Sequence, residues 1–220
     1  MKIKGAIFDM DGTVIDSLWV WDYLWEELGK KYLKKEGFRP LVEDDRAVRT
    51  MILKDAMTLI ADNYSLGEPL DVLDTTEKII VDFYSEKVLP KKDCVEYLEM
   101  LKAKGIKMCV ASATAKELLA IAIAKCDLGK YFEAVVSCAD VGKSKDSPEV
   151  FFEALKVLGT SLEETAVFED SAVAAETAKK AGFFVVGVYD QNNFGHEKLI
   201  ANSDRYISQE GAFAEVSDLI

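Results

Sequence analysis

The sequence is poor in proline, cysteine and histidine, with 4 Pro, 4 Cys and 1 His among 220 residues. The cysteines, at positions 94, 109, 126 and 138, form no CxxC pair, and three of them lie in apolar stretches. We therefore expect buried thiols and no disulfide framework or zinc site. His196 stands far along the chain from Ser112, which lacks a G-x-S-x-G frame. This arrangement argues against a serine–histidine hydrolase, and we expect His196 at the surface.

Long apolar runs and positive charge are also scarce. No segment is long and apolar enough to span a bilayer, and none resembles a signal peptide, so we expect a cytoplasmic protein. Lys and Arg number 27 against 39 Asp and Glu, which gives a net charge of -12. This charge argues against binding to nucleic acid or to an anionic membrane. An anionic ligand must therefore meet local lysines or a metal ion.

What the chain does have is an alternation of strand and helix patterns. We expect strands at Ile3–Phe8, Ile106–Ala111, Ala134–Cys138, Thr165–Phe168, Phe183–Val188 and Arg205–Ile207. The expected helices are Val95–Lys104, Ala115–Lys125, Pro148–Leu158, Ala172–Lys180, Asn193–Ala201 and a last one after Glu210. Strands that alternate with helices of this length form βαβ units, so the sequence predicts an α/β fold with a parallel sheet.

Residues 17–88 interrupt this alternation, because they carry helical periodicity and no strand signal. The helical stretches are Leu18–Tyr32, Asp45–Tyr64 and Leu70–Val88. The block is a candidate insertion, so we expect a core of residues 1–15 and 90–220 and a helical domain of residues 16–89.

Two features of this helical block leave alternatives open. All three tryptophans lie in its first stretch, and a core stripe is favoured over an aromatic roof above a ligand pocket. Arg46 and Arg49 could meet an anionic substrate, although solvated surface charge is the favoured interpretation.

Asp9 and Asp11 follow the first expected strand. Ligands of open α/β sheets bind at the carboxyl ends of strands, and alternation along a strand would turn these two side chains the same way. Neighbouring carboxylates repel unless a cation or a shared proton offsets their charge, and Mg²⁺ fits such oxygen ligands. A calcium loop needs Asp or Asn where Thr13 stands. A catalytic site is therefore favoured over a calcium loop or a solvated acidic turn.

Three further polar segments follow expected strands. Ala111-Ser112-Ala113-Thr114 offers hydroxyls and N–H groups suited to phosphate, with a plain helix N-cap at Thr114 as the alternative. Gly142 to Pro148 carries two lysines but lacks the first glycine of a P-loop. Glu169-Asp170 forms a second acid pair that could complete a metal site with Asp9.

In this order the segments resemble the four motifs of the haloacid dehalogenase-like hydrolases. The matching residues are Asp9-x-Asp11-Gly12-Thr13, Ser112, Lys145 and Glu169-Asp170-Ser171. The likeness is to the branch with β-phosphoglucomutase and phosphoglycolate-phosphatase-like enzymes. It implies a Rossmann-like core, a helical cap domain and Mg²⁺-dependent phosphoryl transfer. Asp146 replaces a proline of the family's lysine motif, and Ala174 stands where a glycine is common.

The resemblance also implies roles for the acidic residues. Asp9 would be the nucleophile and a Mg²⁺ ligand. Asp11 would be the general acid and base, with its main-chain carbonyl on the metal. Asp170 would bind Mg²⁺, and Glu169 would bind it directly or through water.

The remaining roles concern the phosphoryl group. By the same resemblance Ser112, the Ala113 N–H and Lys145 would hold it, and an aspartyl-phosphate would form. The sequence thus predicts a monomeric, Mg²⁺-dependent phosphatase of a small phosphorylated metabolite such as a sugar phosphate. Trp21 stands where β-phosphoglucomutase-like members carry a cap histidine, so a mutase is the second hypothesis. A catalytically silent binding module on the same fold is the third.

Overall fold

The structure is a computed structural model that describes residues 2–49, 51–209 and 211–219. It divides into two compact units, which we call the core unit (Met1–Leu18 and Val88–Ile220) and the helical unit (Trp19–Lys87). The chain thus leaves the core unit after Leu18, while the expected boundary stands after residue 15. Within the described ranges, no helix has the length and apolar character needed to cross a membrane.

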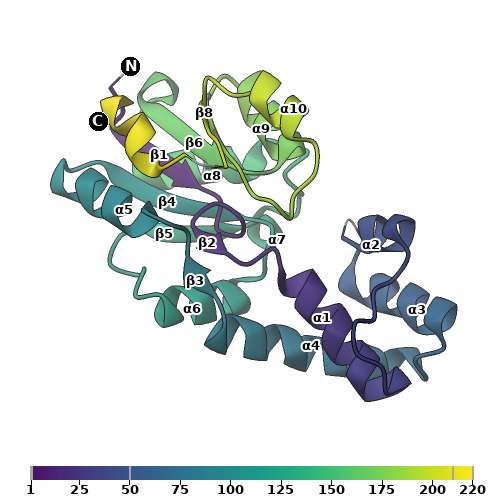
Figure 1. Ribbon diagram of the computed structural model, residues 1–220. Helices are drawn as coiled ribbons and strands as arrows, with labels where there is room; N and C mark the ends of the chain where they lie inside the picture. The colour runs from purple at the N-terminus through teal and green to yellow at the C-terminus, as the bar shows by residue number, and fades with distance from the viewer. Residues whose placement is uncertain (1, 50, 210, 220) are drawn as a thin grey trace. The chain divides into compact units, whose positions relative to one another are not determined.

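The core unit contains a six-stranded parallel sheet with the order β5-β4-β1-β6-β7-β8 (Figure 1). Its strands are β1 (Gly5–Phe8), β4 (Lys107–Ser112), β5 (Ala134–Ser137), β6 (Thr165–Glu169), β7 (Phe184–Val188) and β8 (Arg205–Ile207). β1 lies in the middle, with Phe8 level with Val110 of β4 and with Phe168 of β6. The α/β fold with a parallel, Rossmann-like sheet is therefore confirmed.

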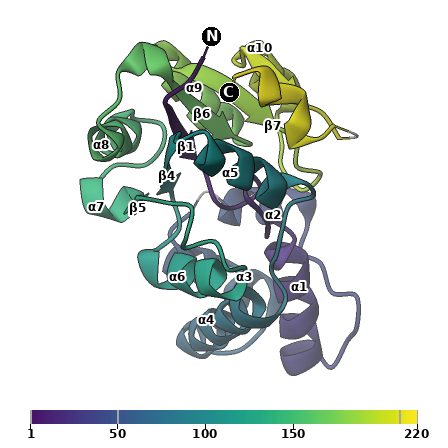
Figure 2. The same ribbon diagram turned by 90° about the vertical axis from the view of Figure 1, so that its left-hand side faces the viewer.

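Helices cover both faces of this sheet because the central strands are apolar on both faces. The helices of the core unit are α5 (Cys94–Ala103), α6 (Lys116–Lys125), α7 (Cys138–Val141), α8 (Glu149–Leu158), α9 (Ala172–Lys180) and α10 (His196–Ala201), with 3₁₀ turns η2 (Leu162–Glu164) and η3 (Phe213–Leu219). Ile7 belongs to a buried cluster with Phe151 of α8 and Ala175 of α9. The ring of the next residue, Phe8, stacks on Phe168, which packs near Tyr97 of α5. Figure 2 shows β1 between α8 and α5.

Some expected elements differ from those observed. Cys138 begins α7 instead of ending a strand, because Ser137 and Asp140 form a capping box there. α10 begins at His196, not at Asn193. Part of the last expected helix is the 3₁₀ turn η3, and Glu210 lies outside the described residues.

The helical unit packs around its own apolar cluster. Its elements are α1 (Val20–Leu28), the π-helix η1 (Gly29–Leu33), α2 (Val42–Val48), α3 (Leu53–Tyr64) and α4 (Pro69–Glu86). Trp25 is buried among Leu28, Met57 and Ile60, and its indole N–H donates to Asp45 at 2.7 Å. The favoured core role of the tryptophans therefore holds for Trp25.

The helix expected over Asp45–Tyr64 is wrong as one piece. α2 ends at Val48 and α3 begins at Leu53, with Ile52 in an extended conformation between them; Thr50 lies outside the described residues. Arg49 pairs with Asp45 at 2.9 Å and is mostly shielded from solvent, so it is not a freely solvated charge; a contact with an anionic substrate stays a prediction.

A two-stranded antiparallel ribbon marks both places where the core unit meets its insertion. β2 (Ile15–Asp16) pairs with β3 (Leu89–Pro90), so that Ile15 faces Pro90 and Asp16 faces Leu89. The two ends of the core unit at the insertion therefore lie side by side, which lets the core unit form one continuous sheet although its sequence is interrupted.

Candidate active site

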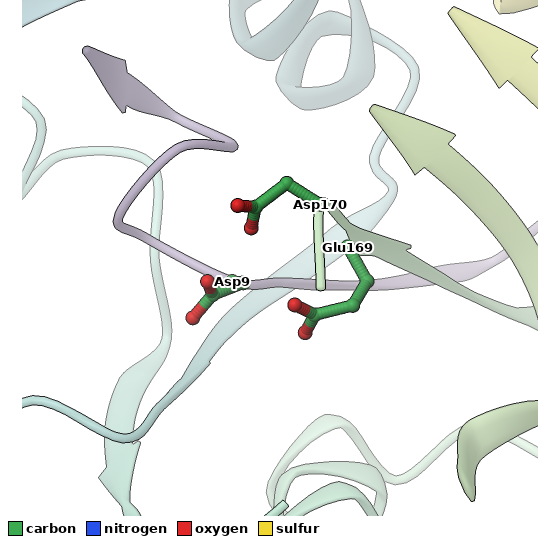
Figure 3. A group of neighbouring side chains, drawn as sticks. All are labelled: Asp9, Glu169 and Asp170. Carbon is green, nitrogen blue, oxygen red and sulfur yellow. The ribbon is translucent and has the colours of Figure 1, made fainter. Parts of the chain in front are cut away.

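The acidic residues expected to act together gather at the carboxyl ends of β1 and β6. Oxygen atoms of Asp9, Glu169 and Asp170 lie within 4.8 Å of one another, and all three residues are buried (Figure 3). β1 and β6 are adjacent and in register, and the Asp9 N–H donates to the Phe168 carbonyl at 2.9 Å. Parallel pairing therefore brings the first and last motifs to one point.

Lys145 joins this group from the loop before α8. Its ammonium lies 2.6 Å from Asp9 Oδ1 and 2.7 Å from Glu169 Oε2, and the lysine is only 9% exposed. The other oxygen of Glu169 accepts the Ser171 N–H at 3.0 Å. Within the part of the chain that the structure describes, one ammonium, that of Lys145, faces a buried group of three carboxylates, which leaves an excess of negative charge.

The excess charge alters proton affinity in the metal-free site. Burial raises the pKa of Glu169 to about 7, with the Asp9 charge adding to the effect and Lys145 opposing it. Burial and the charges of Asp9 and Glu169 raise the pKa of Asp170 well above its ordinary value. Burial opposes the charged form of Lys145, but Asp9 and Glu169 outweigh it and raise the pKa of that lysine, which therefore stays protonated.

Asp11 lies in the turn after β1, so the alternation argument for a strand does not apply to it. Its Oδ1 accepts the Ser17 hydroxyl at 2.6 Å, and its Oδ2 accepts the Thr114 hydroxyl at 2.8 Å. Among the described residues the acidic group of three does not include the Asp11 side chain. The expected contribution of Asp11 to the metal was its main-chain carbonyl, which stays a prediction.

The last residue of β4, Ser112, supplies the hydroxyl group that was expected to meet phosphate. Ser112 ends β4 and is buried, and its Oγ accepts the Thr114 N–H at 3.1 Å, which leaves the Ser112 O–H proton free to point elsewhere. Ala113 is exposed. Thr114 is not the helix cap considered above, because the N-cap of α6 is Ala115.

Turn geometry after β1 fits the site closely. Gly12 has a φ of +77°, and a Cβ at that position would lie 2.8 Å from Asp170 Cγ. The neighbouring Thr13 hydroxyl donates to Asp170 Oδ1 at 3.0 Å. Only a residue without a side chain lets this turn pass the Asp170 carboxylate.

Sequence reasoning missed Asn193, and His196 is less exposed than the surface position expected for it. Asn193, from the loop after β7, donates its amide to Asp170 Oδ2 at 2.6 Å. His196 is half-buried: its ring packs on Tyr189, and its Nε2 lies 2.9 Å from the Asp190 carbonyl oxygen. Neither residue belongs to a motif with a fixed spacing, so the sequence alone offered no pattern that would have identified either of them.

Comparison with known proteins gives relatives over nearly the whole chain. A phosphorylated carbohydrates phosphatase of Thermotoga maritima is 29% identical over 217 residues, which cover 94% of this chain and 95% of the relative. A phosphoglycolate phosphatase of Aquifex aeolicus is 26% identical, over 82% of each protein. A putative β-phosphoglucomutase of Thermotoga maritima has a similar structure, with a TM-score of 0.85, 23% identity, and 99% and 100% of the two chains covered. That last likeness concerns the fold.

A model of the haloacid dehalogenase-like hydrolase family matches residues 3–182. The matched span runs from just before β1 to just after α9, so it includes both acid pairs, Ser112 and Lys145. It covers most of the chain and agrees with the order in which the strand ends supply these side chains. The chain therefore belongs to the haloacid dehalogenase-like hydrolase family.

Proposed function

We propose that this protein is a Mg²⁺-dependent phosphatase that hydrolyses a small phosphorylated metabolite, of the sugar-phosphate type, through phosphorylated Asp9. The observation that carries the proposal is the buried group of Asp9, Glu169 and Asp170 with its single ammonium, Lys145. The names of the relatives, which include phosphatases of phosphorylated carbohydrates and of phosphoglycolate, support the substrate class.

The donor set suits a hard divalent cation. All of its side-chain ligands are carboxylate oxygens, which Mg²⁺ prefers, and their negative charge exceeds that of Lys145. Asp9 and Asp170 would hold the cation, with Glu169 in direct or water-mediated contact and the Asp11 carbonyl as a further ligand. When bound, Mg²⁺ would neutralise phosphoryl oxygens and help to place the phosphorus in line with Asp9.

The protein groups would then carry out two displacements. An Asp9 oxygen attacks phosphorus, the phosphorus–oxygen ester bond breaks, and protonated Asp11 gives its proton to the leaving oxygen. Water next attacks the aspartyl-phosphate, Asp11 takes a proton from that water, and inorganic phosphate leaves. Throughout, the phosphoryl oxygens would be held by the positive charge of Lys145, the hydroxyl of Ser112 and the N–H of Ala113, because anionic oxygens accept hydrogen bonds and attract cations.

The first test is turnover of an aryl phosphate such as p-nitrophenyl phosphate. Asp9→Asn is expected to lower kcat by at least about 1,000-fold, because the amide cannot act as the nucleophile. The matched control is Asp127→Asn, which removes an exposed carboxylate paired with Lys130 and is expected to change little. Excess chelator should abolish activity, and added MgCl₂ should restore it. Full activity in chelator would contradict the metal requirement, and the absence of any turnover would favour the silent binding module.

The second candidate is a sugar phosphomutase, favoured by the named fold relative with a TM-score of 0.85. A mutase needs proton handling in the cap, yet Trp21 packs beside Trp25 at 5.8 Å between ring centres. Its single N–H does not titrate near neutral pH. We therefore expect inorganic phosphate release from sugar phosphates to outpace formation of the isomeric sugar phosphate when a sugar bisphosphate is present. The reverse ratio would establish the mutase.

A further inference from the structure

The side-chain amide nitrogen of Asn193 is directed at Asp170. Its Nδ2 donates to the carboxylate Oδ2 of Asp170 at 2.6 Å and to the main-chain carbonyl of the same residue at 3.1 Å. Its Oδ1 accepts the Phe194 N–H at 2.8 Å, which fixes the orientation of the amide. Both protons of the amide nitrogen are therefore used on one acidic residue.

Asp170 is thus held on both oxygens. Thr13 donates to Oδ1 at 3.0 Å and Asn193 donates to Oδ2. Each carboxylate oxygen has two lone pairs, so one lone pair on each oxygen is left for a cation. Donors on both sides also prevent the carboxylate from rotating away from Asp9 and Glu169. The arrangement is that of a ligand oriented by its neighbours.

An ion pair between buried Asp190 and half-buried Lys91 holds the loop that carries Asn193. Asp190 begins this loop after β7 and is only 2% exposed, and its Oδ2 lies 2.7 Å from the Lys91 ammonium. Lys91 also donates to the Tyr189 carbonyl at 2.8 Å, and Asp190 Oδ1 accepts the Asn192 N–H at 2.8 Å. The loop is therefore fixed at its start by a residue that directly follows β3.

We propose that Asn193 is a positioning residue that orients Asp170 toward the metal, and that the Lys91–Asp190 pair holds Asn193 in place. The inference rests on the proposed Mg²⁺-dependent function. It assigns a task to a segment beyond residues 3–182, the part that the family model matches. Loss of such an outer hydrogen bond typically weakens metal binding about 10- to 100-fold.

The direct test measures Mg²⁺ binding by calorimetry and by the rise in melting temperature on addition of MgCl₂. Asn193→Ala is expected to raise the Mg²⁺ concentration for half-saturation at least about tenfold. The matched control is Asn202→Ala, which removes an amide that donates to the Lys198 carbonyl, and it should keep the original value. A purely structural role would lower the melting temperature of the metal-free protein and leave the Mg²⁺ constant unchanged.

The indirect test compares Lys91→Met with Lys92→Met, a neighbouring exposed lysine. Lys91→Met should raise the half-saturating Mg²⁺ concentration in the same direction as Asn193→Ala, while Lys92→Met should not. If the unmodified protein binds Mg²⁺ and Asn193→Ala has the same half-saturating Mg²⁺ concentration, this inference alone is overturned. An unmodified protein without any Mg²⁺ response would overturn the proposed function and this inference with it.

Discussion

Lys145 connects two carboxylates that come from distant parts of the chain, Asp9 and Glu169. Removing its charge would leave buried acids unpaired and would also remove a cation from the proposed phosphate site. We expect Lys145→Ala to lower kcat/KM by about 100-fold or more. Lys143, two residues earlier, is exposed. The kcat/KM of Lys143→Ala should therefore stay close to that of the unmodified protein. A large loss on changing Lys143 and none on changing Lys145 would contradict the assignment.

Glu169 makes the stability of the metal-free protein depend on pH. Its pKa is about 7 in the folded protein against an ordinary value of 4.5. Since the folded-state value is the higher one, the stabilisation from its bound proton is complete below pH 4.5 and is lost as the pH rises through about 7. The shift corresponds to a difference of about 3 kcal/mol in the free energy of unfolding.

The measurement is the free energy of unfolding by chemical denaturation in excess chelator. The pH values run from about 5 to about 8, so that they lie on both sides of the folded-state pKa of Glu169. The unmodified protein should lose stability over this window relative to Glu169→Gln, whose amide does not titrate. Parallel pH profiles for the two proteins would show that Glu169 does not take up this proton.

Among the elements, the turn between β1 and β2 passes directly against the site, because Gly12 lies beside the Asp170 carboxylate. Gly12→Ala would force a side chain onto φ +77° and against Asp170 and Leu18. We expect it to lower kcat/KM by at least about tenfold and to weaken Mg²⁺ binding, because Asp170 must shift. Gly37→Ala is the control, since its φ is also positive at +67° but no atom lies within 4 Å of the added Cβ. Equal effects of the two changes would mean that backbone strain alone is responsible.

The elements that sequence reasoning located well are those with a continuous, buried apolar run. Runs such as Ile106–Ala111 and Thr165–Phe168 are apolar and β-branched, so they indicate buried strands, and the structure has β4 and β6 within a residue of these ranges. The four motifs could be located because each lies at the end of such a strand or in the chain that follows it, although α7 stands between β5 and Lys145. Their meeting point then follows from the parallel order of the sheet.

The features that the sequence did not predict depend on contacts between residues far apart in the chain or on breaks that no local pattern encodes. The break between α2 and α3 interrupts an apolar spacing that runs through Val48, Ile52 and Ala56 without glycine or proline. Asn193 reaches Asp170 only because β7 lies beside β6. The hydroxyl of Thr114 serves Asp11, not its own helix, because β4 lies beside β1.

At the scale of the whole molecule, the division into two units predicts that the core unit folds without the helical unit. Residues 19–87 leave and return next to the β2–β3 ribbon, where Asp16 faces Leu89. The buried cluster around Phe151 is built from residues of the core unit. Replacing residues 19–87 by a short glycine–serine linker should therefore keep a cooperative thermal transition and the rise in melting temperature with MgCl₂.

The same truncated protein tests the proposed role of residues 16–89 as a cap domain. We expect its kcat/KM to fall more for a sugar phosphate than for a small aryl phosphate, because a cap would exclude water and select the substrate. Equal losses for both substrates would contradict a role in selection. A truncated protein without a cooperative transition would contradict the independence of the core unit.

The central place of β1 in the sheet has a consequence for folding during synthesis on the ribosome. Among the strands of this sheet β1 comes first in the sequence, and it pairs with β4 on one side and with β6 on the other. During synthesis one edge of β1 can pair once Lys107–Ser112 has emerged, but the other edge stays unpaired until Thr165–Glu169 follows. An apolar strand with an open edge invites aggregation and chaperone binding. The proposed metal site would then be complete only after β6 emerges and brings Asp170 beside Asp9.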